Sequence, residues 1–160
     1  MHRYFIVFPL VCCLLFTGCS SAPVPDSEKE FETIIELPGM DRMSIYDKAN
    51  IWAVRNLNAD IQYENAQTGT IAGTFSYGVS IKHLLYQATH VKCIFTVSIK
   101  EGKARLNIRF AEFHITSNTL NIDTWKDPSS ADFEKCQFEK KCSELSDDIA
   151  QFEKSASEKW

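Results

Sequence analysis

Cysteine and histidine are the reactive side chains of this sequence, and their spacing decides what chemistry they fit. The 160 residues include six cysteines and four histidines. His83, His90 and His114 follow neither an HExxH nor a CxxC…H pattern, the spacings that bring ligands onto one metal ion. The cysteines form no CxxC pair, the spacing of a thiol redox centre. The sequence therefore predicts neither a metal site nor a redox site.

No motif of a hydrolase or a nucleotide-binding enzyme occurs either. The sequence has no Gly-x-Ser-x-Gly elbow, and the segment at residues 69–73 lacks the lysine of a phosphate-binding loop. Carboxylates are spread along the chain without a distinct pair. We therefore expect a binding protein without a cofactor. A hydrolase is kept as a further class only because catalytic groups meet in space and not in sequence.

Lipid attachment to Cys19 is the chemistry that the N-terminal residues predict. An apolar run at residues 4–16 is too short to span a bilayer and is typical of a secretory signal. The run leads to Gly18-Cys19, which resembles the bacterial lipobox. The resemblance implies cleavage between Gly18 and Cys19 and a membrane anchor on the Cys19 thiol, and Ser20 implies delivery to the outer membrane, facing the periplasm. The alternative is an ordinary cleaved signal with a chance cysteine.

Charge and composition indicate one acidic globular domain behind this anchor. The chain has 17 basic and 21 acidic residues, a net charge of −4 and no long basic run, so we expect no nucleic-acid partner. We expect a signal peptide at residues 1–18, a lipidated start and flexible tether at 19–30, one domain at 31–154 and a tail at 155–160.

Alternating apolar residues predict an antiparallel sheet. Residues 31–37 alternate as one strand, and residues 61–63 and 70–77 flank a glycine-containing turn, which predicts a hairpin. Beyond Phe110 the pattern shifts by one residue, which predicts a bulge near Ala111. A second hairpin, around the turn at Glu101-Gly102, would pair only apolar residues with one another: Ile99 with Ala104, Val97 with Leu106, Phe95 with Ile108 and Cys93 with Phe110.

Two helices are expected on one face of that sheet. Ser44 is expected to cap the first, which buries Trp52 and ends near Asn56. Ser130 is expected to cap a long, continuous final helix with an apolar stripe of Phe138, Cys142, Leu145, Ile149 and Phe152. Residues 78–89 stay open between strand and loop, and residues 116–125 are expected to form a polar crossover. The predicted fold is therefore α+β, a curved antiparallel sheet in the order β-α-β-β-β-β-α.

Three short segments of these elements resemble a known family. They are residues 45–52 (IYDKANIW), residues 69–73 (GTIAG) and residues 97–105 (VSIKEGKAR). They are similar to the Tyr-x-x-Ala-x-x-Trp helix, Gly-x-Ile-x-Gly strand and Lys-acid-Gly-x-x-Arg hairpin of a bacterial domain family of unknown function with a TBP-like fold. The resemblance covers roughly residues 31–116 and implies that topology, with no catalytic residues. The acidic charge and the predicted export argue against DNA binding.

Three cysteines follow Cys19. Cys136 and Cys142 lie six positions apart, so on a continuous helix they would be about 9 Å apart along the axis, too far for a disulfide. Cys93 and Cys142 face inward from elements that are expected to pack together, so we expect them to pair in an oxidising periplasm. Three unpaired core thiols are the alternative.

The outer face of the sheet is the candidate docking surface. Lys92, Arg105 and Arg109 point outward and fit either a solvated face or a surface for a partner protein or cell-wall component. His114 is expected to be exposed at a strand end. We expect a lipid-anchored, non-enzymatic envelope protein that binds a protein partner. The alternative is a carrier or sensor of a small apolar ligand between the sheet and the C-terminal helix, although bulky inward side chains favour a filled core.

Overall fold

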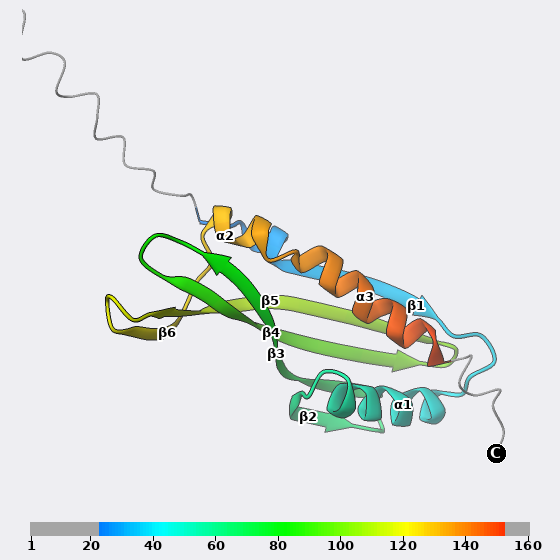
Figure 1. Ribbon diagram of the computed structural model, residues 1–160. Helices are drawn as coiled ribbons and strands as arrows, with labels where there is room; N and C mark the ends of the chain where they lie inside the picture. Colours follow the sequence, from blue (N-terminus) through cyan, green and yellow to red (C-terminus); the bar gives the residue numbers. More distant parts are fainter. Residues whose placement is uncertain (1–22, 153–160) are drawn as a thin grey trace, which may run out of the picture.

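Six antiparallel strands form one sheet in the computed structural model, which describes residues 23–152 (Figure 1). The strand order is β1-β5-β4-β3-β2, and β6 pairs with the second half of β5, beyond the part that pairs with β1. The predicted α+β class and the antiparallel sheet are confirmed. The strands are β1 (Glu30–Glu36), β2 (Asp60–Asn65), β3 (Thr70–Lys82), β4 (Gln87–Lys100), β5 (Lys103–Ser117) and β6 (Ile122–Lys126).

The helices cover one face of this sheet, as predicted. The α-helices are α1 (Arg42–Arg55), α2 (Ser130–Lys135) and α3 (Phe138–Ala150), and a 3₁₀ helix, η2 (Asp26–Lys29), precedes β1. Figure 1 shows α3 lying along β1 and β5 and α1 beside β2 at the other edge. Phe95 of β4 packs edge-on against Trp52 of α1, and Cys93 of the same strand is buried near Cys142 of α3. Because alternate residues of a strand share a face, both helices lie on the same side.

The first helix begins three residues earlier than the capping prediction. Asp41, and not Ser44, is the N-cap: its Oδ1 accepts a 2.9 Å hydrogen bond from the Ser44 backbone N–H. The Ser44 hydroxyl donates to the other carboxylate oxygen of Asp41 at 2.6 Å. These bonds hold the pKa of Asp41 below its usual value, because they stabilise the carboxylate. The prediction was wrong because either residue type caps helices, and the aspartate takes the earlier position.

The central hairpin is confirmed residue by residue. All four predicted apolar pairs across β4 and β5 occur in the register of the sheet. The bulge also occurs where it was expected: Cys93 pairs with Phe110 and the preceding Lys92 with Glu112, so Ala111 is the extra residue. The bulge turns Phe113 back into the core, where it is buried.

Two segments without a clear apolar pattern also form strands. Residues 78–89 close a hairpin, since β3 runs to Lys82, β4 starts at Gln87 and the His83 backbone N–H donates to the Tyr86 carbonyl at 2.9 Å. The predicted polar crossover at residues 116–125 is instead the end of β5, a turn and β6. That prediction was wrong because β6 is an edge strand whose side chains are mostly exposed, so it lacks the alternation that burial imposes.

The predicted final helix is broken in two. Gln137 adopts a left-handed conformation with φ 53°, which separates α2 from α3. Ser129, and not Ser130, caps α2, with its hydroxyl oxygen accepting from the Asp132 backbone N–H. The whole apolar stripe begins at Phe138, after the break, so its spacing does not show that the helix is interrupted at Gln137.

The folded part begins before Phe31. Val24 is buried and Pro23 forms an isolated bridge with Ser129, so the predicted tether to residue 30 is too long. The predicted signal peptide, Cys19 and the C-terminal tail lie outside the described residues. None of the helices within residues 23–152 is long and apolar enough to cross a bilayer.

Candidate docking face on the sheet

The side of the sheet opposite the helices is the candidate functional site, which we call the outer face. The structure places all three sequence-predicted residues there: Lys92 on β4 and Arg105 and Arg109 on β5. Their neighbours on the inner side, such as Leu106 and Ile108, are fully buried. Strand alternation therefore sets the direction of these charges, which is why sequence reasoning found them.

A hollow of about 700 Å³ lies on this face. Its walls come from η2, from the strands β1 to β5 and from the segment after β6, so it depends on the whole sheet and not on one hairpin. Most of its lining side chains are polar or charged, namely Asp26, Lys29, Glu30, Gln62, Thr74, Lys92, Arg109, Glu112 and Asp127, and Ile94, Phe110 and Ala111 are the apolar ones. Such a lining fits a polar and charged surface better than an apolar small molecule.

The three predicted cations differ in whether an acidic side chain lies close enough to neutralise them. The Lys92 Nζ lies 3.8 Å from Glu112 Oε2 and 5.7 Å from the centre of the Trp125 ring. The Arg105 Nε lies 4.0 Å from Glu32 Oε1, at the limit of an ion pair. Arg109 is exposed, lines the hollow and has no hydrogen bond or ion pair with the described residues. Of the three predicted cations, Arg109 is thus the one that no described acidic side chain neutralises.

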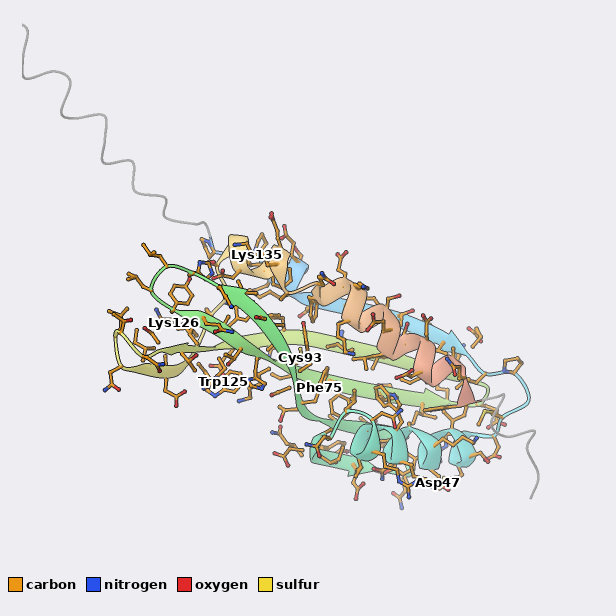
Figure 2. All side chains as sticks on the ribbon, viewed as in Figure 1. Asp47, Phe75, Cys93, Trp125, Lys126 and Lys135 are labelled. Carbon is orange, nitrogen blue, oxygen red and sulfur yellow. The ribbon has the colours of Figure 1, made fainter. Side chains whose placement is uncertain are left out.

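An aromatic cluster beside the hollow was missed by sequence reasoning. The rings of His114 and Trp125 lie 4.9 Å apart, and the His114 Nε2 lies 2.8 Å from Asp123 Oδ1 (Figure 2 labels Trp125). The prediction of a solvent-exposed His114 was wrong, since only 24% of its side chain is exposed. Finding the cluster required β6, whose pairing with β5 sets Trp125 opposite His114. The signal available in the sequence was Trp125, a tryptophan within a polar segment, and this does not identify the residue that it contacts.

The three cysteines meet on the inner side. Cys93, Cys136 and Cys142 are all buried and are free thiols in the structure. Burial raises the pKa of all three, that of Cys142 to about 12. The Cys93–Cys142 disulfide therefore stays a prediction about the oxidised protein. Because the break at Gln137 lies between Cys136 and Cys142, these two residues do not share one continuous helix, and the expected separation of about 9 Å along its axis does not apply.

A second hollow, of about 350 Å³, lies between the end of β3 and the α2–α3 junction. Tyr77 and Cys136 line it together with Lys135, Lys140 and Lys141. Burial raises the pKa of the Tyr77 hydroxyl. Three lysines at its edge do not fit the predicted small apolar ligand between sheet and C-terminal helix.

No three histidine, cysteine, aspartate or glutamate side chains in residues 23–152 gather as a set that fits a metal ion. His83, one of the histidines considered above, instead contacts Asp132, with 2.5 Å between its Nε2 and Oδ1 of the carboxylate. His90 is exposed and lies next to the Thr89 hydroxyl at 3.1 Å.

Comparison with known proteins identifies the fold independently of these contacts. A family model described as a domain of unknown function (DUF4468) with TBP-like fold matches residues 31–116. A DUF4468 family protein from Bacteroides ovatus is similar in structure, with a TM-score of 0.53 and 18% identity over 89% of this chain and 93% of that one. A TBP-like protein from Parabacteroides distasonis has a TM-score of 0.56 and 13% identity over 82% and 97% of the two chains. No curated protein matches the chain.

Proposed function

We propose that this chain, which belongs to the DUF4468 family of domains with a TBP-like fold, is a lipid-anchored protein of the bacterial cell envelope. Its family membership confirms the resemblance carried by the three short sequence segments. In this proposal Cys19 anchors the protein in the outer membrane, facing the periplasm, and the domain binds a protein partner without catalysing a reaction. The basis for the anchor is the lipobox-like Gly18-Cys19 at the end of an apolar run.

The observation that carries the binding function is Arg109 in its hollow. An arginine without an ion-pair partner among the described residues, at the edge of a hollow of about 700 Å³, offers a planar donor to a carboxylate. The hydroxyl of Thr74 and the amide of Gln62 line the same hollow and add hydrogen-bonding groups. We therefore propose a partner protein that inserts an acidic side chain here.

The outer face suits this role better than the inner face. The inner face is covered by α1 and α3 and filled with aromatic and aliphatic side chains, for example Phe95 and Phe110. The outer face carries half-exposed polar side chains over most of β3, β4 and β5, with the exposed Ile34 at its edge. A polar surface with a few apolar contacts is typical of interfaces that form and dissociate.

Site-specific photocrosslinking in cells tests this proposal. A photoreactive residue at Gln62, exposed at the hollow, is expected to capture one envelope protein. Arg109→Glu is expected to remove that adduct, because it places a carboxylate against the partner's acidic group. The matched control carries the same photoreactive residue at Ser143, exposed on α3 on the opposite side of the sheet.

Three results are decisive, provided that the variants fold with unchanged thermal stability. An adduct from Gln62 that Arg109→Glu abolishes supports the outer face as the binding surface. An adduct that survives Arg109→Glu, or the same set of adducts from Gln62 and Ser143, contradicts it. Absence of any adduct from either position contradicts the binding function as a whole.

A further inference from the structure

One end of the molecule exposes leucines on the tips of two hairpins. Leu84 is 98% exposed and Leu85 is 52% exposed in the turn between β3 and β4, and Leu120 is 48% exposed in the turn between β5 and β6. Figure 1 shows the two turns at the same end of the sheet, next to α2. We call Leu84, Leu85 and Leu120 the leucine tip. Exposed leucines are common singly, but three on adjacent turns at one end need a physical explanation.

The two turns are fastened to each other. The Ser117 hydroxyl donates to the Leu85 carbonyl at 2.5 Å, and the Leu120 backbone N–H donates to the Ser117 hydroxyl oxygen at 3.1 Å. Ser117 itself is buried. The hydrogen bonds of Ser117 thus hold the two turns, and the leucines on them, in a fixed position relative to each other.

The β3–β4 turn is also hydrogen-bonded to α2. The His83 Nε2 lies 2.5 Å from Asp132 Oδ1, and the Tyr86 hydroxyl donates to Asp132 Oδ2 at 3.4 Å. The rings of His83 and Tyr86 stack with their centres 4.3 Å apart. Asp132 is only 6% exposed, so this contact is an internal part of the fold.

The chain enters the domain at this end. Pro23 forms a bridge with Ser129, the N-cap residue of α2, and Val24 is buried. Cys19 precedes Pro23 by four residues. Four residues span at most about 14 Å when fully extended. A lipid on Cys19 would therefore hold Pro23, and the end of the molecule to which it belongs, close to the bilayer.

We propose that the leucine tip inserts into the interfacial region of the bilayer that holds the anchor, so that the domain is oriented by two contacts. This inference rests on the proposed lipidation of Cys19. Exposed leucine side chains on turns that are held in place partition into the region between headgroups and acyl chains. The exposed Lys82, which ends β3 beside the first of the two turns, suits anionic headgroups. The strands then point away from the membrane and leave the outer face open to a partner.

Fluorescence of tryptophan placed at the tip tests the insertion. The full chain, purified from bacterial membranes, is reconstituted in vesicles of phosphatidylethanolamine and phosphatidylglycerol that contain brominated acyl chains. Leu84→Trp is expected to shift the emission to the blue and lose most of the added fluorescence to bromine quenching. The matched control is Lys103→Trp, exposed at the β4–β5 turn at the other end of the long strands, which is expected to show neither change.

Flotation of the same vesicles separates this inference from the proposed function. Protein that floats with the vesicles but shows no quenching at Leu84→Trp is anchored without insertion, which overturns the leucine tip alone. Protein that does not float refutes the anchor and with it the proposed function. A blue shift without quenching by brominated lipid means that protein, such as a second copy, covers the leucines, and it also overturns the insertion.

Discussion

Two glycines show why a short family motif is structural. A Cβ atom on Gly73 would lie 2.3 Å from the Asp60 carbonyl oxygen, because β2 crosses β3 closely at its bulge. Gly69 has φ +68°, and a Cβ atom there would lie 2.6 Å from the Ile99 carbonyl oxygen. Both positions of the Gly-x-Ile-x-Gly segment therefore exclude a side chain by contact with backbone. The motif identifies the fold and leaves the function open.

Gly73→Ala is expected to lower the free energy of unfolding by about 1–3 kcal/mol, since the β2–β3 hairpin must move to make room. Urea denaturation measures this change. Gly78→Ala is the matched control on the same strand, because nothing lies within 4 Å of the position that its methyl group would take, and it is expected to be neutral or slightly stabilising. Equal losses in both variants would contradict the close approach of β2.

The buried thiols predict a loss of stability at alkaline pH. Burial first, and then neighbouring charge, raise the pKa of Cys142 from 9.0 to about 12, so the folded state holds the proton longer than the unfolded chain. The stabilisation is complete below about pH 9 and is lost as the pH rises towards 12. In the reduced protein, Cys142→Ala should make the decline between pH 9 and 11 shallower by up to about 1.4 kcal/mol per pH unit.

Urea denaturation at a series of pH values, with reductant present, gives this slope directly. The absolute stability of Cys142→Ala also falls because the substitution leaves a cavity, so the slope and not the stability at one pH is the test. An unchanged slope means that the thiol is not buried as described.

At the scale of elements, the contacts of Asp132 with His83 and Tyr86 hold the β3–β4 turn against α2. His83→Ala removes the bond to Asp132 and is expected to lower the free energy of unfolding by about 1–3 kcal/mol, because a buried carboxylate loses one of its hydrogen-bond partners. Hydrogen exchange should become faster in the turn and in α2 and stay unchanged in the β4–β5 hairpin. His90→Ala, at an exposed histidine of β4, is the control and should change neither region. Faster exchange spread evenly over the sheet would mean that the contact of His83 with Asp132 does not act locally.

Because the final helix is broken at Gln137, we expect two glycine substitutions to change the free energy of unfolding in opposite directions. Gln137→Gly is expected to raise the free energy of unfolding by up to about 1 kcal/mol, because glycine adopts the left-handed conformation found there without steric cost. Lys140→Gly, inside α3, should lower it by about 1 kcal/mol. If both substitutions destabilise equally in thermal or urea denaturation, the helix is continuous.

The elements that sequence analysis predicted correctly share one property: burial of one face. The Phe95–Ile108 and Val97–Leu106 pairs could be predicted because a one-residue shift would turn the apolar side chains outward, so only one register is possible. The bulge at Ala111 follows from the same constraint. β6 and the break at Gln137 were not predicted, because an edge strand with exposed side chains, and a break that precedes the apolar stripe, leave no such pattern.

For the molecule as a whole, the sequence located the outer face, the candidate docking face, but not its shape. Strand alternation placed Lys92, Arg105 and Arg109 on one side. It did not distinguish Lys92, held near Glu112 and Trp125, from Arg109, which has no such partner among residues 23–152. That distinction depends on β6 and η2, which come together with β5 only in three dimensions. The leucine tip likewise needs two turns 35 residues apart, at residues 85 and 120, to meet.

The lipid at Cys19 underlies both the proposed function and the leucine tip, and the mass of the mature N-terminus tests it most directly. The full chain is produced in a bacterium with two membranes, extracted from the outer-membrane fraction with detergent and analysed by intact and peptide mass spectrometry. We expect a chain that starts at Cys19 and carries a diacylglycerol and an amide-linked acyl chain, and a Cys19→Ser protein without either. A mature chain that starts at another residue, or at Cys19 without lipid, would contradict the anchor.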